Sequence, residues 1–303
     1  MSATPRVSAV IVSFNTREHL LRCIASLESH VTQPLDVVVV DNGSSDGSAD
    51  AVRRTHPAAR VIENGANLGF AAATNRGLRE ARAAYCLLLN SDAEVTAGSV
   101  EALAAILDER ADVGIVGPRT VGADGGPQVS FGPDLTPVSE WRQRRLVRAL
   151  RERRPETVRE VEMMSAREQE PAWVSGACLL ARKSALDAVG GLDERFFLYE
   201  EDVDLCLRAR QAGWRVLYTP RAVVMHHLGR SMETIPALSR LEYDRSHLRF
   251  YAKHRGPAAN TLLRFYLAGS SAAGWVAALG PGSERRARRR EHASALRLAF
   301  SRA

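Results

Sequence analysis

Residues 7–48, VSAVIVSFNTREHLLRCIASLESHVTQPLDVVVVDNGSSDGS, place an amphipathic segment between two apolar runs. The runs VSAVIVSF and LDVVVV are rich in β-branched residues, and both predict buried strands. Between them, Leu20, Ile24 and Leu27 recur at the spacing of one helix face. Apolar strands separated by a helix are typical of a parallel sheet whose two faces are both covered.

The same alternation continues to about residue 120. Three more apolar runs predict strands, ARVIEN (59–64), YCLLL (85–89) and VGIVG (113–117), and a helix is expected around 98–109. A Gly/Pro-rich stretch then leads into an arginine-rich segment, 141–154, and residues 155–170 resemble a loop. Strand patterns return in WVSGACLLAR (173–182), WRVLYTP (214–220) and AVVMHH (222–227), and the last seventy residues favour helices.

Charge and cysteine content restrict the class of protein. The 303-residue chain has a formal net charge of +6, and much of its arginine lies in 141–154 and 284–291. Aromatic residues are sparse among these arginines, so we expect an anionic lipid surface or a solvated face and no nucleic acid. The four cysteines are far apart in apolar settings, which predicts buried thiols in a reducing compartment. The N-terminal apolar run lacks the length and basic flank of a signal peptide.

Small polar residues follow each of the first four predicted strands. They are Ser13 and Asn15, Asp41 and Asn42, Asn64 and Asn67, and Asn90, Ser91 and Asp92. Ligands of open α/β sheets bind beyond the carboxyl ends of the strands, so this edge predicts a ligand site. The chain has neither G-x-G-x-x-G after the first strand nor a Walker A sequence, so a bound diphosphate would need a metal. Asp92 and one of His226 and His227 are the candidate ligands.

The stretch LYEEDVDLC, 198–206, packs four carboxylates into five positions. Burying such charges without compensation is costly, so the stretch is either a solvated helix face or a site that needs a base beside a cation. Asp204 is expected to pair with Arg208 at i,i+4 spacing.

Taken together, VIVSFN, VVVVDNGSSDGS, NLGFAAATNRG, LLLNSD, VSGACLLARKSALDAVGGLDERFFLYEEDVDLCLRARQAGW and MHHLGRS resemble the family 2 glycosyltransferases. More narrowly, they resemble the rhamnosyltransferase-like branch that builds bacterial cell-surface glycans. The resemblance covers about residues 6 to 231 and implies a GT-A fold, an α/β, Rossmann-like and mostly parallel sheet flanked by helices. We expect this domain over 1–231 and a helical, basic C-terminal extension over 232–303.

The resemblance implies further divisions and roles. Within the domain it implies a nucleotide-binding half (1–120), a variable insertion (133–170) and an acceptor and catalytic half (171–231). It implies that Asp41 reads the donor's pyrimidine and that Asp202 is the catalytic base. It also implies that Asp92 and His226 bind the metal; His226, five residues before Ser231, fits the motif better than His227. The remaining implied residues are Ser13, Asn15, Asn67, Gly69, Asn75, Asn90 and Ser91 for the donor nucleotide, and Trp173, Gly176, Glu200 and Glu201 for the acceptor. Asn90 departs from the family's D-x-D motif, which leaves the metal one carboxylate fewer.

The expected activity is an inverting sugar transfer that depends on Mg²⁺ or Mn²⁺. The donor is expected to be dTDP-rhamnose, with UDP-sugars second, and the acceptor a lipid-linked or growing surface glycan. A nucleotide-sugar hydrolase and a non-catalytic binding subunit are the alternatives. Residues 265–280 carry no charge but are too short to span a membrane. We therefore expect a cytoplasmic protein that is peripheral on the inner face of the cell membrane. Glu200 and Glu201 are expected either to bind acceptor hydroxyls or to hold Asp202 in place.

Overall fold

The computed structural model describes residues 4–227 and 236–301, and the chain forms two compact units. The first, called here the sheet unit, comprises Met1–Arg195 and Asp202–Ser231. The second, the helical unit, comprises Phe196–Glu201 and Met232–Ala303. The short segment before Asp202 therefore packs with the C-terminal helices.

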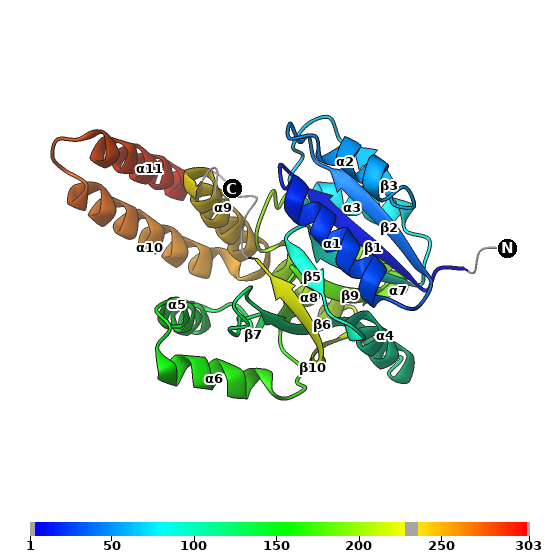
Figure 1. Ribbon diagram of the computed structural model, residues 1–303. Coiled ribbons are helices and arrows are strands. Elements are labelled where there is room, and N and C mark those ends of the chain that lie inside the picture. Colours follow the sequence, from blue (N-terminus) through cyan, green and yellow to red (C-terminus); the bar gives the residue numbers. More distant parts are fainter. Residues whose placement is uncertain (1–3, 228–235, 302–303) are drawn as a thin grey trace. The chain divides into compact units, whose positions relative to one another are not determined.

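An eight-stranded sheet forms the centre of the sheet unit, in the order β3-β2-β1-β4-β9-β6-β10-β5 (Figure 1). Its strands are β1 (Val7–Ser13), β2 (Leu35–Asp41), β3 (Arg60–Glu63), β4 (Tyr85–Asn90), β5 (Ala93–Val95), β6 (Val113–Val121), β9 (Cys178–Arg182) and β10 (Arg215–His226). The first four strands pair in parallel, as do β6 and β10, whereas β9 and β5 are antiparallel to their neighbours. The expected mostly parallel α/β sheet is confirmed.

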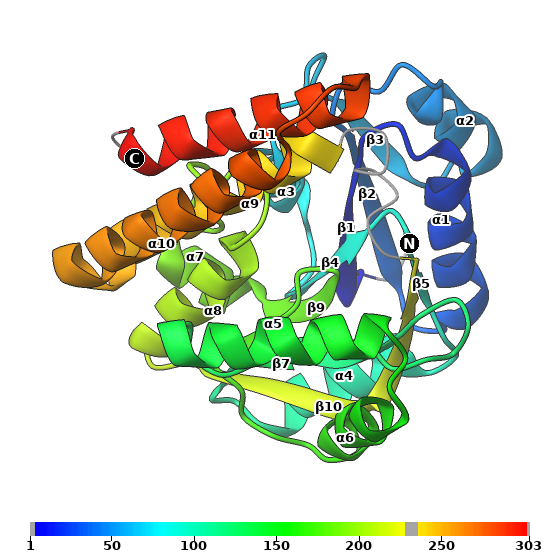
Figure 2. The same cartoon turned by 90° about the vertical axis from the view of Figure 1, so that its left-hand side faces the viewer.

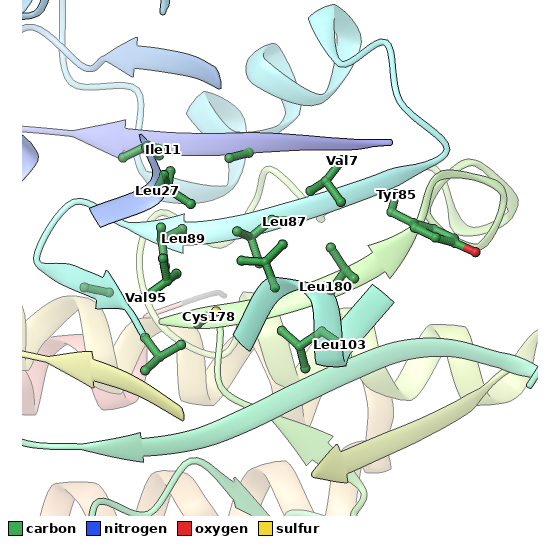
Figure 3. Packing of buried hydrophobic residues seen from close by; sticks show 14 of the residues in the cluster. Val7, Ile11, Leu27, Tyr85, Leu87, Leu89, Val95, Leu103, Cys178 and Leu180 are labelled. Atoms are coloured by element: carbon green, nitrogen blue, oxygen red, sulfur yellow. The ribbon is translucent and has the colours of Figure 1, made fainter. Parts of the chain in front are cut away.

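Helices cover both faces of this sheet, and each strand contributes alternate residues to the two cores. Val7, Ala9 and Ile11 of β1 pack with α1 (Arg17–His30) and α4 (Ser99–Glu109), a cluster that Figure 3 shows in part. Val10 of β1 belongs to the opposite cluster. That cluster includes residues of α3 (Phe70–Glu80), α7 (Lys183–Val189) and α8 (Glu201–Gln211). The short helix α2 (Ser48–Thr55) packs against α1 and β3.

One segment differs in type from the sequence prediction. The loop expected over 155–170 contains the helix α6 (Pro155–Ser165), which follows α5 (Pro137–Arg151) (Figure 2). Val161 is the one apolar residue that α6 buries, beside Thr157 and Ser165, so its hydrophobic periodicity is too weak to identify a helix. The helix α5 begins with a capping box between Thr136 and Ser139.

Strand boundaries differ as well. The run 173–182 divides into β8 (Trp173–Val174), which pairs with β7 (Phe131–Gly132), and β9, separated by Ser175–Ala177. The two runs 214–220 and 222–227 instead form one strand, β10, with a shift of register between Thr219 and Val223. Pro220 lies at that irregularity, where a strand tolerates a residue without an N–H.

The helical unit contains α9 (Pro236–His254), α10 (Gly256–Ala277) and α11 (Ser283–Phe300), of which α10 and α11 form an antiparallel pair (Figures 1 and 2). Arginine side chains from each helix bind backbone carbonyls at the C-terminal end of the other. Arg264 of α10 donates to the carbonyls of Ala299 and Ser301. Arg285 and Arg289 of α11 donate to carbonyls of residues 278–280, which follow the last residue of α10. Among the helices that the structure describes, none combines the length and apolarity needed to cross a membrane.

Candidate active site

The register of the parallel strands brings their polar ends into one row. Ser13 of β1 lies opposite Asp41 of β2, Asp41 opposite Glu63 of β3, and Val12 opposite Asn90 of β4. The chain runs outward from β1 through β2 to β3 and then returns to β4 on the other side of β1. This reversal is the topological switch point, where open α/β sheets bind their ligands.

A chain of three buried hydroxyl groups spans the switch point. Ser13 Oγ lies 3.0 Å from Thr16 Oγ1, which lies 2.8 Å from Ser91 Oγ. The predicted donor-site residues Ser13 and Ser91 are thus linked, and Thr16 is a link that sequence reasoning missed. The signal was a hydroxyl residue just before the first predicted helix, the position of an N-cap.

Asp41 is buried, and its two carboxylate oxygens have different surroundings. Oδ2 accepts a hydrogen bond from the backbone N–H of Ser44, 3.1 Å away. Oδ1 has no hydrogen-bond partner in the described part of the chain. A buried carboxylate oxygen left in this way is costly unless a ligand donates to it.

The loops after β1, β2 and β3 hold one another through side-chain amides. The Oδ1 of Asn15, a residue with a φ of 53°, accepts from the N–H of Ser45. Asn42 Nδ2 donates to Asn67 Oδ1 and to the carbonyl of Gly69, at 2.8 Å and 3.2 Å. Asn67 Oδ1 also accepts from the N–H of Gly69. These contacts hold the loops around Asp41 in place, and they add Asn42 to the candidate site.

Asp92 and His226 come together through the antiparallel pairing of β5 with β10. His226 lies opposite Ala93 in that pair, and its Nε2 is 3.3 Å from Asp92 Oδ1. His226 Nε2 makes no hydrogen bond to any described residue, so its short distance to Asp92 Oδ1 is not that of a hydrogen-bonded pair. The neighbouring His227 instead places its Nε2 2.8 Å from Glu94 Oε1.

The chain itself supplies few metal ligands. Within residues 4–227 and 236–301, no group of three or more His, Cys, Asp or Glu side chains could hold a metal ion. A buried imidazole and a carboxylate nevertheless fit a divalent cation whose remaining ligands are diphosphate oxygens and water.

Asp202, near the start of α8, is fixed by two backbone donors. Its Oδ2 accepts from the N–H of Gly176 at 2.7 Å, and its Oδ1 from the N–H of Val203 at 2.8 Å. A β-carbon at Gly176 would lie 3.2 Å from the Asp202 Cβ, so glycine permits this close approach. Asp202 is partly exposed, in contrast to the buried Glu200, Glu201 and Asp204.

Most of the chain matches one known protein family. Residues 5–251 match the model described as glycosyltransferase like family 2. The chain belongs to this family. Its expected class, a glycosyltransferase, is therefore confirmed.

One curated relative and two solved structures are similar to the chain. The chain is 32% identical over 295 residues to the N-acetylglucosaminyl-diphospho-decaprenol L-rhamnosyltransferase of Mycobacterium tuberculosis, over 89% of this chain and 91% of that protein. It is also similar to the Pyrobaculum calidifontis mannosyltransferase PcManGT, solved with GDP-Man and Mn²⁺. That match has 19% identity and a TM-score of 0.61, over 97% of this chain and 86% of that one. GalNAc-T7, solved with UDP, GalNAc and Mn²⁺, has a TM-score of 0.60, 16% identity and coverage of 97% and 55%. The expected GT-A fold is confirmed.

Two predicted site residues of this family 2 enzyme, Asn75 and Trp173, make hydrogen bonds within the protein. The side-chain amide of Asn75 donates to the carbonyl of Leu192 and accepts from its N–H, which ties α3 to the loop after α7. The indole N–H of Trp173 donates to the carbonyl of Pro133, and its ring is buried. Both residues support loops of the sheet unit.

The acidic stretch also divides by environment. Asp204 is fully buried and pairs with Arg208 at 2.6 Å, as its spacing predicted. Glu200 and Glu201 are buried in the helical unit. The last residues of the motif MHHLGRS, from 228 to 231 and including Ser231, lie outside the described residues.

Proposed function

We propose that this protein is an inverting, metal-dependent glycosyltransferase that moves a sugar from a nucleoside diphosphate donor to a glycan hydroxyl. The observation that carries the proposal is the approach of His226 Nε2 to Asp92 Oδ1, 3.3 Å apart and without a hydrogen bond, beyond the strand ends. The name of the mycobacterial relative favours rhamnose as the sugar and a lipid-linked acceptor. The donor of this proposal is dTDP-rhamnose, and a growing surface glycan is the other acceptor. UDP-sugars are the second choice of donor.

Asp202 acts as the general base in this proposal. Its carboxylate takes the proton from the acceptor hydroxyl as the acceptor oxygen bonds to the anomeric carbon of the donor. The bond from that carbon to the diphosphate breaks on the opposite side, and the diphosphate leaves with the electron pair. The two N–H groups that donate to Asp202 fix the direction of the carboxylate. Attack opposite the leaving group inverts the anomeric configuration.

Asp92 and His226 hold the cation, Mn²⁺ or Mg²⁺. When bound, a divalent cation neutralises the charge of the diphosphate and makes it a better leaving group. An imidazole ligand suits a transition metal better than Mg²⁺, which favours Mn²⁺. Asn90 stands where the resemblance implies a carboxylate, so oxygens of the donor would supply further contacts to the cation.

Asp41 selects the nucleotide in this proposal. Its Oδ1, which has no hydrogen-bond partner among the described residues, accepts a hydrogen bond from N3–H of uracil or thymine, whereas cytosine has no N–H at that position. The donor lies along the row of Ser13, Asn15, Asn67, Gly69, Asn90 and Ser91. Asn75 contributes by holding α3 in place.

The helical unit has a surface that could bind the membrane in which a lipid-linked acceptor is anchored. The helix α10 exposes the large apolar side chains of Leu262, Phe265, Tyr266, Trp275 and Val276, and Leu279 is exposed just after the helix. The arginines Arg286, Arg288 and Arg290 of α11 are exposed. Apolar side chains next to basic ones favour reversible binding to an anionic leaflet. The proposed location is the inner face of the cell membrane, with the protein peripheral to it.

The experiment that tests the function is a transfer assay with dTDP-rhamnose and UDP-sugars, with and without a polyprenyl-diphosphate-linked GlcNAc acceptor. The proposal expects a glycosylated lipid and free dTDP in equal amounts when Mn²⁺ is present. Release of free sugar at the same rate without acceptor would instead identify a nucleotide-sugar hydrolase.

A further inference from the structure

The turn immediately before Asp202 has an unusual backbone. Tyr199 and Glu200 have φ values of 70° and 64°, the left-handed region that side chains other than glycine rarely adopt. Two consecutive residues of this kind are costly, and they persist only where surrounding contacts hold them. The turn therefore needs restraints.

The helix α9 provides two of these restraints from adjacent residues. Ser246 Oγ donates a hydrogen bond of 2.7 Å to the carbonyl of Leu198. His247 Nδ1 lies 3.0 Å from Glu200 Oε1. An ionised carboxylate can only accept, so Nδ1 carries the proton in that state. Each side of the strained turn thus has its own contact with α9.

Aromatic rings fix the orientation of the histidine. His247 is fully buried, stacked at 5.6 Å on the ring of Tyr243 and 5.1 Å from the ring of Tyr251. Tyr199 of the turn meets Tyr243 edge to face at 5.7 Å. Glu200 is also buried, with a side chain only 6% exposed. A carboxylate held in this way is suited to anchoring the turn and poorly placed to meet an acceptor hydroxyl.

We propose that Ser246 and His247 are positioning residues for Asp202, acting through Leu198 and Glu200. This inference rests on the proposed role of Asp202 as the base. The turn and α9 belong to the same compact unit, and the chain passes from Glu200 to Asp202 through a single residue, Glu201. The Gly176 N–H holds the carboxylate of Asp202, and the anchored turn holds its backbone.

The reason such anchoring matters is the short reach of a general base. A base must lie within about 2.6–3.2 Å of the proton that it removes. A displacement of about 1 Å, even from a distant change, can cost roughly 10²-fold in rate. Loss of the turn's anchor should therefore lower kcat and leave donor binding unchanged.

The test compares Glu200→Ala and His247→Ala with Glu200→Gln in the full chain. Both alanine variants should lower kcat at least 10-fold while the donor KM stays within about 2-fold. Glu200→Gln should recover most of the activity, because its amide oxygen still accepts from His247 Nδ1. The double alanine variant should be no slower than either single one, since both remove the same contact.

His254→Ala is the matched control, since His254 lies on the same helix and packs against Phe250, 4.9 Å between ring centroids. Equal losses of kcat in His254→Ala would mean that general damage to α9 is responsible, and would overturn the proposal. A raised acceptor KM with unchanged kcat in Glu200→Ala would also overturn it, since Glu200 would then bind the acceptor.

Amide hydrogen exchange across residues 198–203 makes the test independent of activity. Exchange should be faster in Glu200→Ala and His247→Ala than in wild type, and unchanged in Glu200→Gln and His254→Ala. If the wild type transfers no sugar, the proposed function fails, while this measurement still decides whether α9 restrains the turn. Equal exchange in all variants would exclude the restraint.

Discussion

His226 Nε2 lies 3.3 Å from Asp92 Oδ1, although the two residues are far apart in the sequence. The antiparallel pairing of β5 with β10 places His226 opposite Ala93 and so beside Asp92. The next histidine, His227, contacts Glu94 instead. This difference between two consecutive histidines gives a matched pair of variants.

The first prediction concerns that pair. His226→Ala and Asp92→Ala should weaken donor binding in Mn²⁺ at least 10-fold, because each removes a ligand of the cation. His227→Ala should bind the donor as wild type does. Isothermal titration with dTDP, with and without EDTA, measures the effect. Equal affinity in EDTA and in Mn²⁺ would exclude the metal role.

The second prediction concerns the base. Asp202→Asn keeps the shape of the side chain but cannot take a proton at neutral pH. Turnover should fall by roughly 10² to 10⁴, while the thermal shift produced by the donor is retained. Asp187→Asn, on the exposed surface of α7, is the control and should be unaffected. Turnover near wild type in Asp202→Asn would move the assignment to Glu201.

The third prediction concerns Asp41, whose Oδ1 is buried without a partner in the described chain. Asp41→Ala should weaken UDP and dTDP by about 10-fold, the loss of one hydrogen bond to a charged group, and leave GDP unchanged. Asp50→Ala, exposed on α2, is the control. Competition assays measure the order of affinities, and GDP binding as well as dTDP to the wild type would refute pyrimidine selection.

The fourth prediction concerns membrane binding by the helical unit. Replacing Arg286 and Arg290 with serine should weaken binding to anionic liposomes by about 2 kcal/mol, or roughly 30-fold. Arg285 and Arg289 are left intact because they cap α10. Serines at Arg142 and Arg145 of α5 remove the same charge elsewhere and should change binding little. Co-sedimentation at low and high salt measures these effects. If the wild-type protein does not bind anionic liposomes at low salt, the proposal is wrong.

The fifth prediction concerns the four cysteines, all buried and free. Burial raises the pKa of the Cys178 and Cys206 thiols to about 12 and that of Cys86 to about 11. The reactive thiolate is therefore suppressed, and a thiol reagent at pH 8 should label none in the folded protein and four after denaturation. Rapid labelling of the folded protein would contradict this.

These thiols also make stability depend on pH. Their folded pKa values lie above the unfolded value of about 8.5, so the folded state binds their protons more tightly. Their contribution to stability is complete below about pH 8.5 and is lost as pH rises toward 12. Denaturant unfolding at a series of alkaline pH values measures the loss.

Local patterns along the chain were enough to identify the class of the fold and to group polar residues at one edge of the sheet, where the candidate site is proposed. Apolar runs such as 35–40 identify strands locally, and Ser13, Asp41 and Asn90 mark their ends. Because parallel strands carry their carboxyl ends to one edge, these residues can be grouped from their positions in the sequence. The helix α6 was not predicted, because Val161 is the one apolar residue that it buries and its hydrophobic pattern is therefore weak.

Which of these residues meet depends on the packing of remote elements. The pairing of β5 with β10 selects His226 over His227, since a shift of one residue in register turns a strand's side chains to the other face. Likewise, Asn75 accepts a hydrogen bond from Leu192, and Glu200 pairs with His247 of α9. Both contacts join segments that are remote in the sequence. Such long-range contacts leave no local pattern, because they depend on how whole elements pack and not on the spacing of neighbouring residues.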